Sequence, residues 1–405
     1  MQKKMCAIAD YEPFVGPEIV DRILRKAKVL QGFRVVNFSS TGYGGGVAEL
    51  LTGMTILMNS AGIKAEWRVM QGRPDFFNIT KKFHNALQGA DINLSEIKTN
   101  IFEQVNFENA VRNRIDHDVV LVHDPQPLAL IDFFSKKCPW IWRCHVDLSE
   151  PHGATWQYLV GFIQKYDAVI LSCESYKQEL RIPQLFFMPA IDPFNVKNKQ
   201  LTEEETDERL AHYDIPVDLP LVVQVSRFDR WKDPKGVVEA FKIVREEVAA
   251  TLVLLGNFAS DDPEGARVYE QLTSMREERI LVLPAGDDTA LVNTLQRKAA
   301  IVLQKSIREG FGLTVAEAMW KGTPVIGGNV GGIPNQIESG VNGFLVSSVE
   351  EAAARIVQLL KDKKLREQMG RKAHASVAAR FLLTRYLEQY LDLFSAFETI
   401  LRLRR

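Results

Sequence analysis

The segment that most constrains the fold is one in which a strand, a glycine turn and a helix follow one another directly. Ala299–Leu303 is a short apolar run that predicts a buried strand, and Val315–Trp320 predicts the opening of a helix. Gly310 and Gly312 lie between them. Because the N–H groups at a helix N-terminus have no intrahelical partners, and glycine lets a ligand come close to the backbone, this turn suits an anion such as phosphate.

Two carboxylates flank this turn. Glu309 precedes it at the carboxyl end of the strand, and Glu317 lies about one turn into the helix. Both could accept hydrogen bonds from hydroxyl groups on either side of a bound diphosphate, which is the chemistry that a sugar nucleotide presents. The spacing taken alone favours a simpler interpretation, in which Glu317 caps the helix and Glu309 is solvated.

A second segment of this kind lies near the N-terminus. Phe33–Phe38 predicts a strand, Ser39–Gly46 a glycine-rich loop, and Val47–Met58 a helix. The glycines of the loop match neither the dinucleotide-binding pattern Gly-x-Gly-x-x-Gly nor the Walker pattern, so nicotinamide and P-loop functions are disfavoured. A tight turn that binds no ligand is the alternative.

Strands and helices alternate in both halves of the chain, which predicts an α/β protein with two doubly wound, Rossmann-like parallel-sheet domains. With 405 residues, two domains are expected. We predict one domain over residues 1–205 and the other over residues 206–382, with a ligand cleft between them. A helix over about residues 383–405 would pack back on the first domain. A helix from Pro17 would pack on its own domain or form a homodimer surface.

The composition excludes several classes of function. Hydrophobic residues make up 46% and charged residues 25%, as in ordinary globular proteins. A net charge of −1 gives no electrostatic case for binding nucleic acid or an anionic membrane. The chain has no apolar run of about 18 residues and no signal-peptide pattern, so we expect a cytoplasmic enzyme. The cysteines match no zinc pattern, so we expect reduced thiols and no metal site; they are Cys6, Cys138, Cys144 and Cys173.

Polar side chains follow two predicted strands of the first half, in the segments 118–124 and 140–147. In an open α/β sheet, residues at the carboxyl ends of the strands face the ligand crevice. The residues in question are His123, Asp124, Arg143, His145 and Asp147.

In the second half, two cations follow the predicted strand Pro220–Ser226. Arg227 offers a fork of donors and Lys232 a point charge, which together suit a diphosphate. Cations placed there would stabilise the charge that grows on a departing nucleoside diphosphate. A solvated basic turn is the alternative.

The glycine turn and the segments after it resemble the retaining GT-B glycosyltransferases, the family that includes sucrose and glycogen synthases. The matching segments are Glu309–Glu317, Gly322–Ile326 and Val330–Pro334.

Within that family, further segments are similar to the trehalose glycosyltransferring synthases and, less closely, to the retaining trehalose phosphorylases. They extend over most of the chain and are Tyr43–Leu50, Lys82–Gly89, His123–Pro127, Trp142–Ser149 and Val225–Gly236.

The resemblance implies roles for individual residues. It implies acceptor-binding by Asp124, Arg143 and Asp147, and catalytic roles for His145, Arg227, Lys232 and Glu309. It implies that the first domain serves the acceptor and the second the nucleotide sugar. Binding of the donor and its nucleotide is implied for Gly45, Gly46, Arg227, Lys232, Glu309, Gly310, Phe311, Gly312, Leu313 and Glu317.

The resemblance also implies a reaction, the retaining transfer of α-glucose from a nucleoside diphosphate to free glucose, which gives α,α-trehalose. We expect front-face transfer with His145 orienting the donor sugar, because a double displacement would have only Asp147 nearby as a carboxylate. No cofactor is required in this scheme, although Mg²⁺ could stimulate. A trehalose phosphorylase that uses glucose 1-phosphate, or a non-catalytic sensor of sugar nucleotides, are the alternatives.

Overall fold

The computed structural model describes residues 7–43, 45–257, 263–284 and 288–403. Two residues named in the sequence predictions, Cys6 and the Gly44 of the N-terminal glycine loop, lie outside the described residues. The chain forms two compact units. Unit 1 contains Met1–Ala190 and Leu383–Arg405, and unit 2 contains Ile191–Leu382. The boundary therefore lies after Ala190, whereas we expected it after residue 205.

Unit 1 is built on a six-stranded parallel sheet with the order β2-β1-β3-β4-β5-β6. Successive residues of each strand face opposite sides, so Val36 enters one apolar core and Val35 the other. The strands are β1 (Arg34–Ser39), β2 (Lys64–Val69), β3 (Val119–His123), β4 (Trp140–Arg143), β5 (Ala168–Leu171) and β6 (Gln184–Phe186).

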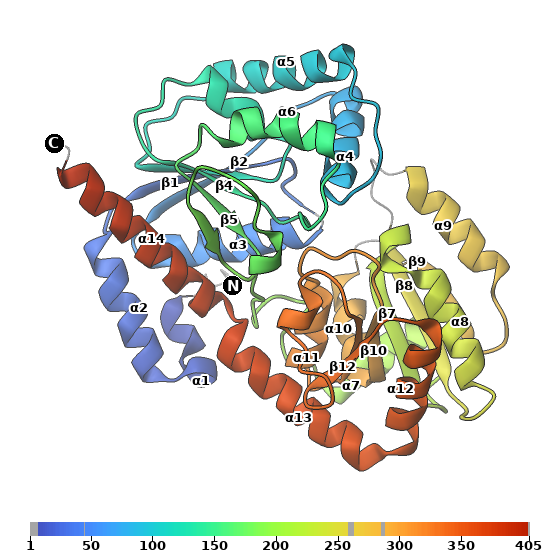
Figure 1. The fold of residues 1–405 in the computed structure, drawn as a ribbon. Coiled ribbons are helices and arrows are strands. Elements are labelled where there is room, and N and C mark those ends of the chain that lie inside the picture. The colour runs from blue at the N-terminus through green and yellow to red at the C-terminus, as the bar shows by residue number, and fades with distance from the viewer. Residues whose placement is uncertain (1–6, 44, 258–262, 285–287, 404–405) are drawn as a thin grey trace. The chain divides into compact units, whose positions relative to one another are not determined.

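Helices cover both faces of this sheet (Figure 1). One core lies under α4 (Pro74–Leu87), α5 (Glu96–Arg112) and α6 (Gly153–Ile163). The other lies under α2 (Pro17–Val29), α3 (Gly45–Ser60) and α14 (Leu383–Leu403). A short helix α1 (Glu12–Val15) precedes α2.

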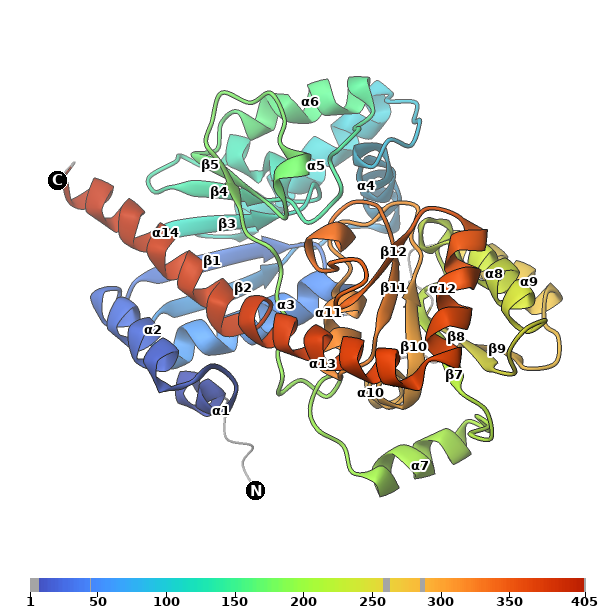
Figure 2. The ribbon, with the colours of Figure 1, turned by 60° about the horizontal axis from the view of Figure 1, so that its bottom comes forward.

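The helix α14 belongs to unit 1, although it follows unit 2 in the sequence. It lies beside α2 in both ribbon views (Figures 1 and 2). Arg22 of α2 donates to Glu388 at 2.6 Å, and Lys26 pairs with Asp392 at 2.7 Å. The ring of Phe394 stacks on Phe33. The predicted N-terminal helix therefore packs on its own domain, against α14.

Unit 2 repeats the plan with a second six-stranded parallel sheet, in the order β12-β11-β10-β7-β8-β9. Its strands are β7 (Leu221–Arg227), β8 (Thr251–Asn257), β9 (Ile280–Pro284), β10 (Ala299–Gln304), β11 (Val325–Gly328) and β12 (Gly343–Val346).

Apolar side chains of α8 (Pro234–Val244), α9 (Pro263–Ser274) and α12 (Val349–Lys361) pack on one face of this sheet. Helices α10 (Thr289–Lys298) and α11 (Leu313–Trp320) contact β10, and α7 (Glu203–His212) contacts α10. The helix α13 (Lys363–Arg380) follows α12 and contacts α11. The predicted fold class, an α/β protein with two doubly wound parallel sheets, is confirmed. Among the described residues, no helix is both long enough and apolar enough to cross a membrane.

Candidate active site

Each sheet has one point at which the chain reverses the direction in which it adds strands. In unit 1 the chain goes from β1 to β2 and then adds β3 on the other side of β1. In unit 2 it goes from β7 through β8 to β9 and then adds β10 on the other side of β7. Ligands of open α/β sheets bind at such switch points, outside the carboxyl ends of the strands. The predicted site residues lie at or beyond the carboxyl ends of β1, β3 and β4 in unit 1, and of β7 and β10 in unit 2.

The glycine turn of unit 2 has the conformation that its sequence requires. Gly312 has φ +83°, a left-handed conformation that side chains disfavour, and it is the N-cap residue of α11. Gln336 donates from its buried amide to the carbonyl oxygens of Phe311 at 2.5 Å and Gly312 at 3.2 Å. A Cβ on Gly332 would lie 2.7 Å from the carbonyl oxygen of Gly310. The turn is therefore held from behind by a close backbone contact and by a buried amide.

The carboxylate of Glu309 collects several donors. Its Oε2 accepts from Lys232 Nζ at 2.7 Å, from Gln304 Nε2 at 2.9 Å and from Ser306 Oγ at 3.1 Å. Glu309, Gln304 and Ser306 are buried. A buried carboxylate needs such partners, because burial without them disfavours its charge. The predicted catalytic pair of a lysine and a carboxylate is thus one hydrogen-bonded cluster.

The loop after β7 is tied to the loop after β10. Lys305 forms an ion pair with Asp233, and the N–H of Ile307 donates to the carbonyl oxygen of Trp231 at 2.8 Å. Asp233 has φ +49° and caps α8 by accepting from the N–H of Gly236. On the strand, buried Gln224 donates to the carbonyl oxygen of Lys232 at 2.8 Å. These contacts fix the backbone that carries Lys232.

Arg227 is the more exposed of the two cations. Its guanidinium lies 3.5 Å from the Asp229 carboxylate, and 44% of its side chain is accessible. Arg227 therefore has the freedom to reach a ligand from the end of β7, whereas Lys232 already holds Glu309.

Glu317 lies on α11, where the prediction placed it, and it is only 4% exposed. Within the described residues its carboxylate receives a single hydrogen bond, from Gln296 Nε2 at 3.5 Å. The Oε1 of Gln296 accepts from Lys321 at 2.8 Å. A buried carboxylate with one long hydrogen bond has unused acceptor capacity, which a ligand hydroxyl could use.

In unit 1, two histidines from neighbouring strand ends meet. His123 Nδ1 lies 3.0 Å from His145 Nε2, and His123 Nε2 lies 3.0 Å from Asn37 Oδ1. Burial and the charge of Arg143 lower the pKa of His123 to about 3, and the same causes lower the pKa of His145 well below its ordinary value. Both rings are therefore neutral at physiological pH.

Asp124 supports His145 through the backbone. It has φ +63°, and its Oδ1 accepts from the N–H of His145 at 2.8 Å. Its own carbonyl oxygen accepts from the indole of Trp142 at 2.9 Å. Burial raises the pKa of Asp124 to about 6, against the opposing effects of this hydrogen bond and of Arg143. We expected Asp124 to hold an acceptor sugar; the structure shows one of its oxygens holding His145.

Two further predicted acceptor ligands are enclosed. Arg143 is 0% exposed and donates to Ser172 Oγ and to the carbonyl oxygen of Phe187. Asp147 is 1% exposed, and its Oδ1 accepts from the N–H and the hydroxyl of Ser149. Both side chains are thus buried in unit 1 and bonded within it, and their assignment as acceptor ligands stays a prediction. Arg143 points toward the interior of unit 1, and Asp147 stabilises a local turn.

The N-terminal glycine loop opens α3. Gly45 has φ +78° and is exposed, and a Cβ added there would meet no atom within 4 Å. Its conformation, and not a lack of space, therefore requires glycine. Gly46 is partly exposed in the first turn of α3. Both residues lie at a switch point, as a ligand-binding loop would.

The sequence analysis missed the buried amides that hold these groups. They are Asn37, Gln224, Gln296, Gln304 and Gln336. Asn37, Gln224 and Gln304 interrupt an apolar run or end one, but strand periodicity does not say which group an amide binds.

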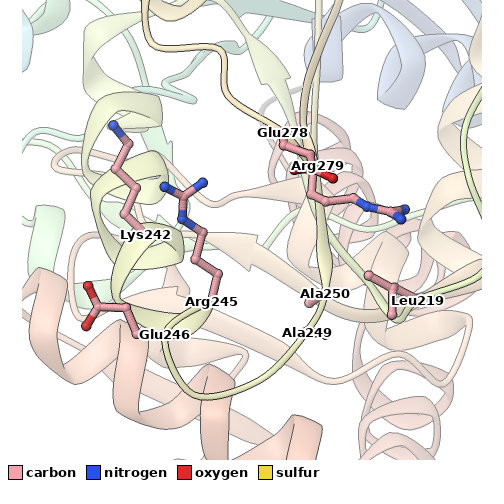
Figure 3. Close-up of a pocket in the computed structure, with 8 residues that line it drawn as sticks. All are labelled: Leu219, Lys242, Arg245, Glu246, Ala249, Ala250, Glu278 and Arg279. Carbon is pink, nitrogen blue, oxygen red and sulfur yellow. The ribbon is translucent and has the colours of Figure 1, made fainter.

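A surface pocket of about 590 Å³ lies elsewhere, near the amino ends of β7, β8 and β9 (Figure 3). Its cations have partners: Lys242 and Arg245 pair with Glu277, and Arg279 pairs with Asp218. Because these charges are already balanced, we do not assign the pocket to an anionic substrate. Among the residues with described positions, no group of three or more His, Cys, Asp or Glu could hold a metal ion.

Two family models match the chain. The one described as "Trehalose synthase, N-terminal domain" matches residues 37–178, and the one described as "Glycosyl transferases group 1" matches residues 205–376.

The chain is also similar to individual proteins. It is 44% identical to a trehalose synthase of Pyrococcus horikoshii over 96% of each chain. It is 28% identical to a trehalose phosphorylase of Pleurotus pulmonarius, over 88% of this chain and 55% of that one. The structure resembles an α,α-trehalose 6-phosphate synthase of Burkholderia multivorans, with a TM-score of 0.73, 14% identity, and coverage of 91% of this chain and 100% of that chain.

Proposed function

The chain belongs to the trehalose synthase family of glycosyltransferases, which have the GT-B fold, and from that premise we propose that it makes α,α-trehalose from a nucleoside diphosphate glucose and free glucose. We further propose that the anomeric configuration of the transferred glucose is retained and that the reaction is reversible.

The observation that carries this proposal is the cluster of Lys232 and Glu309 beside the N-terminus of α11. The cation and the carboxylate are 2.7 Å apart. A nucleoside diphosphate sugar presents anionic oxygens next to sugar hydroxyl groups, and this cluster offers a donor for the first and an acceptor for the second. The N–H groups of Leu313 and the residues that follow add positive potential for the diphosphate.

The environment of Glu317 favours a nucleotide sugar, and not glucose 1-phosphate, as the donor. Its buried carboxylate, with one long hydrogen bond, suits the ribose hydroxyls of a bound nucleotide. A phosphorylase that takes glucose 1-phosphate would have no ribose for it to bind. Substitution of Glu317 should therefore impair a synthase but not a phosphorylase.

We propose front-face transfer. The bond between the anomeric carbon and the phosphate oxygen breaks, and its electron pair stays on the departing diphosphate. The acceptor hydroxyl forms the new bond on the same face, and its proton goes to a phosphate oxygen. Arg227, Lys232 and the α11 terminus stabilise the charge that develops on the diphosphate. Asp147 is a poor nucleophile for a double displacement, because it is enclosed and bonded to Ser149.

We propose that His145 binds the transferred sugar. Because its ring is neutral, it serves as a hydrogen-bonding group and not as a general acid. No metal ion is needed in this scheme, since the two cations and the helix terminus balance the diphosphate; activity should therefore survive treatment with EDTA.

The direct test is to incubate the purified protein with glucose and, in separate reactions, UDP-glucose, ADP-glucose or glucose 1-phosphate. We expect NMR to show α,α-trehalose from a nucleotide sugar, with the preferred base given by the faster reaction. Trehalose from glucose 1-phosphate alone, with release of phosphate, would replace the proposal by the phosphorylase. If no donor gave a disaccharide, either the acceptor is not glucose or the protein is a non-catalytic sensor of sugar nucleotides.

A further inference from the structure

The contact between Asn37 and His123 has a defined direction. Asn37 Nδ2 donates to the carbonyl oxygen of Glu66 at 3.2 Å, so the amide oxygen Oδ1 is the atom that faces His123. The reverse orientation would place two oxygens against each other. Because Oδ1 can only accept, His123 Nε2 must carry the hydrogen.

That hydrogen determines the next bond. A neutral imidazole has one N–H, so His123 with a hydrogen on Nε2 has a lone pair on Nδ1. The Nε2 of His145 lies 3.0 Å from this lone pair and must donate to it. The interplanar angle of the two rings is 17°, which suits a hydrogen bond along in-plane lone pairs. The low pKa of His123 removes the protonated form that could reverse the direction.

We infer that Asn37 and His123 are positioning residues that hold His145 in its Nε2–H tautomer, so that Nδ1 is left to accept a hydrogen bond from a hydroxyl of the bound sugar. Among the described residues, Nδ1 of His145 has no hydrogen-bond partner. The identity of the ligand rests on the proposed function. The tautomer does not, because it follows from contacts within unit 1.

Asn37 and His123 do not need to touch the substrate for this role. Asn37 is 3% exposed and His123 is 3% exposed, and both lie on strands of the sheet. Asp124 holds the backbone of His145, while the Asn37–His123 chain holds its ring. Together these contacts determine both where the ring lies and which of its nitrogens carries no hydrogen.

The test is to record long-range ¹H–¹⁵N correlations of the histidine rings in the full-length protein without substrate. The chain has seven histidines, and single substitutions assign their signals. We expect both His123 and His145 to show a protonated Nε2 and an unprotonated Nδ1. A protonated Nδ1 on His145, or a charged ring, would overturn the inference.

A matched pair of variants tests the role in catalysis. Asn37→Leu keeps the number and branching of the side-chain heavy atoms but removes the acceptor. It should replace the single-tautomer signals of His145 by those of a mixture of tautomers and lower kcat/KM for the donor about tenfold, the order expected when one hydrogen-bond partner is lost in a buried network. Asn109→Leu removes an equally buried amide of unit 1, which bonds to Gln71 and Val105, and should leave those ring signals unchanged.

The variants are first checked for folding by circular dichroism. Unchanged His145 signals and unchanged kinetics in a folded Asn37→Leu variant would refute the positioning role. Because the ring signals are recorded without substrate, they would reveal the tautomer even if the protein made no trehalose. Failure of the proposed function and failure of this inference are thus separate results.

Discussion

The two switch points share one backbone arrangement but differ in how they handle charge. In unit 2, Lys232 and Glu309 form an ion pair that a buried glutamine supports. In unit 1, two neutral histidines form a chain that a buried asparagine begins. An ionised cluster suits a diphosphate, whereas a neutral chain suits hydroxyl groups. The fold thus supplies the position of a ligand, and the polar side chains beneath the strand ends select its chemistry.

The largest effect should follow from removal of the charge in unit 2. Lys232→Ala should lower kcat about 10²- to 10³-fold, because it removes a cation that stabilises the leaving diphosphate and leaves Glu309 without its ionic partner. Steady-state kinetics with the nucleotide sugar measure this. Lys235→Ala, three residues later on an exposed side chain, is the control and should retain activity. Equal losses in the two variants would refute the assignment.

A smaller effect is expected at Glu317. Glu317→Ala should raise KM for the nucleotide sugar about tenfold to a hundredfold, as for a lost hydrogen bond to a charged group. Product inhibition sharpens the interpretation. Inhibition by UDP should weaken, while inhibition by pyrophosphate, which has no ribose, should not change. Equal weakening for both inhibitors would place Glu317 near the diphosphate and not near the ribose.

Replacing the glutamine that supports Glu309 should cost less. Gln304→Leu removes the amide and leaves the Lys232–Glu309 pair, so kcat/KM should fall by about tenfold, through a less constrained carboxylate. Thr251→Val removes a buried hydroxyl from the same sheet and serves as the control. Wild-type kinetics in the Gln304 variant would show that Ser306 and Lys232 suffice to hold Glu309.

The last effect concerns the acid stability of unit 1, and it is measured on folding and not on the reaction. His123 has a folded pKa of about 3, against an ordinary value of 6.5, so on acidification the unfolded chain binds a proton that the folded chain does not. Stability from this group is therefore present above its ordinary pKa and is lost as the pH falls. Between about pH 7 and about pH 5, the free energy of unfolding of the wild type should therefore fall by about 2 kcal/mol more than that of a His123→Leu variant. Urea titrations at the two pH values measure the difference, and equal losses would contradict the depressed pKa.

The sequence predicted the architecture well where a local pattern carries it. The strand, glycine turn and helix around Gly312 appear as predicted, with the left-handed φ that only the structure could reveal. The predicted family and the glycosyltransferase activity are confirmed by the relatives. The roles of the individual site residues stay predictions.

What could not be predicted depends on contacts between residues far apart in the sequence. Lys232 meets Glu309, 77 residues away, only when β7 and β10 lie side by side. Arg143 and Asp147 have the residue types of sugar ligands, yet the direction of one side chain and the turn around the other enclose them. The domain boundary was placed too late because the segment after Ala190 has no distinctive composition; in the structure, Asn198 bonds to Arg297 and Lys321 of unit 2.

The return of α14 to unit 1 has a consequence for the order of folding during synthesis. Leu383, Tyr386, Tyr390 and Phe394 form part of the apolar core of unit 1, yet the ribosome makes them after all of unit 2. Unit 2 is continuous in the chain and can fold while it emerges, whereas the first 190 residues must wait with one face of their sheet incompletely covered. A nascent chain interrupted before residue 383 would therefore expose that face, and with it a surface that chaperones and proteases recognise.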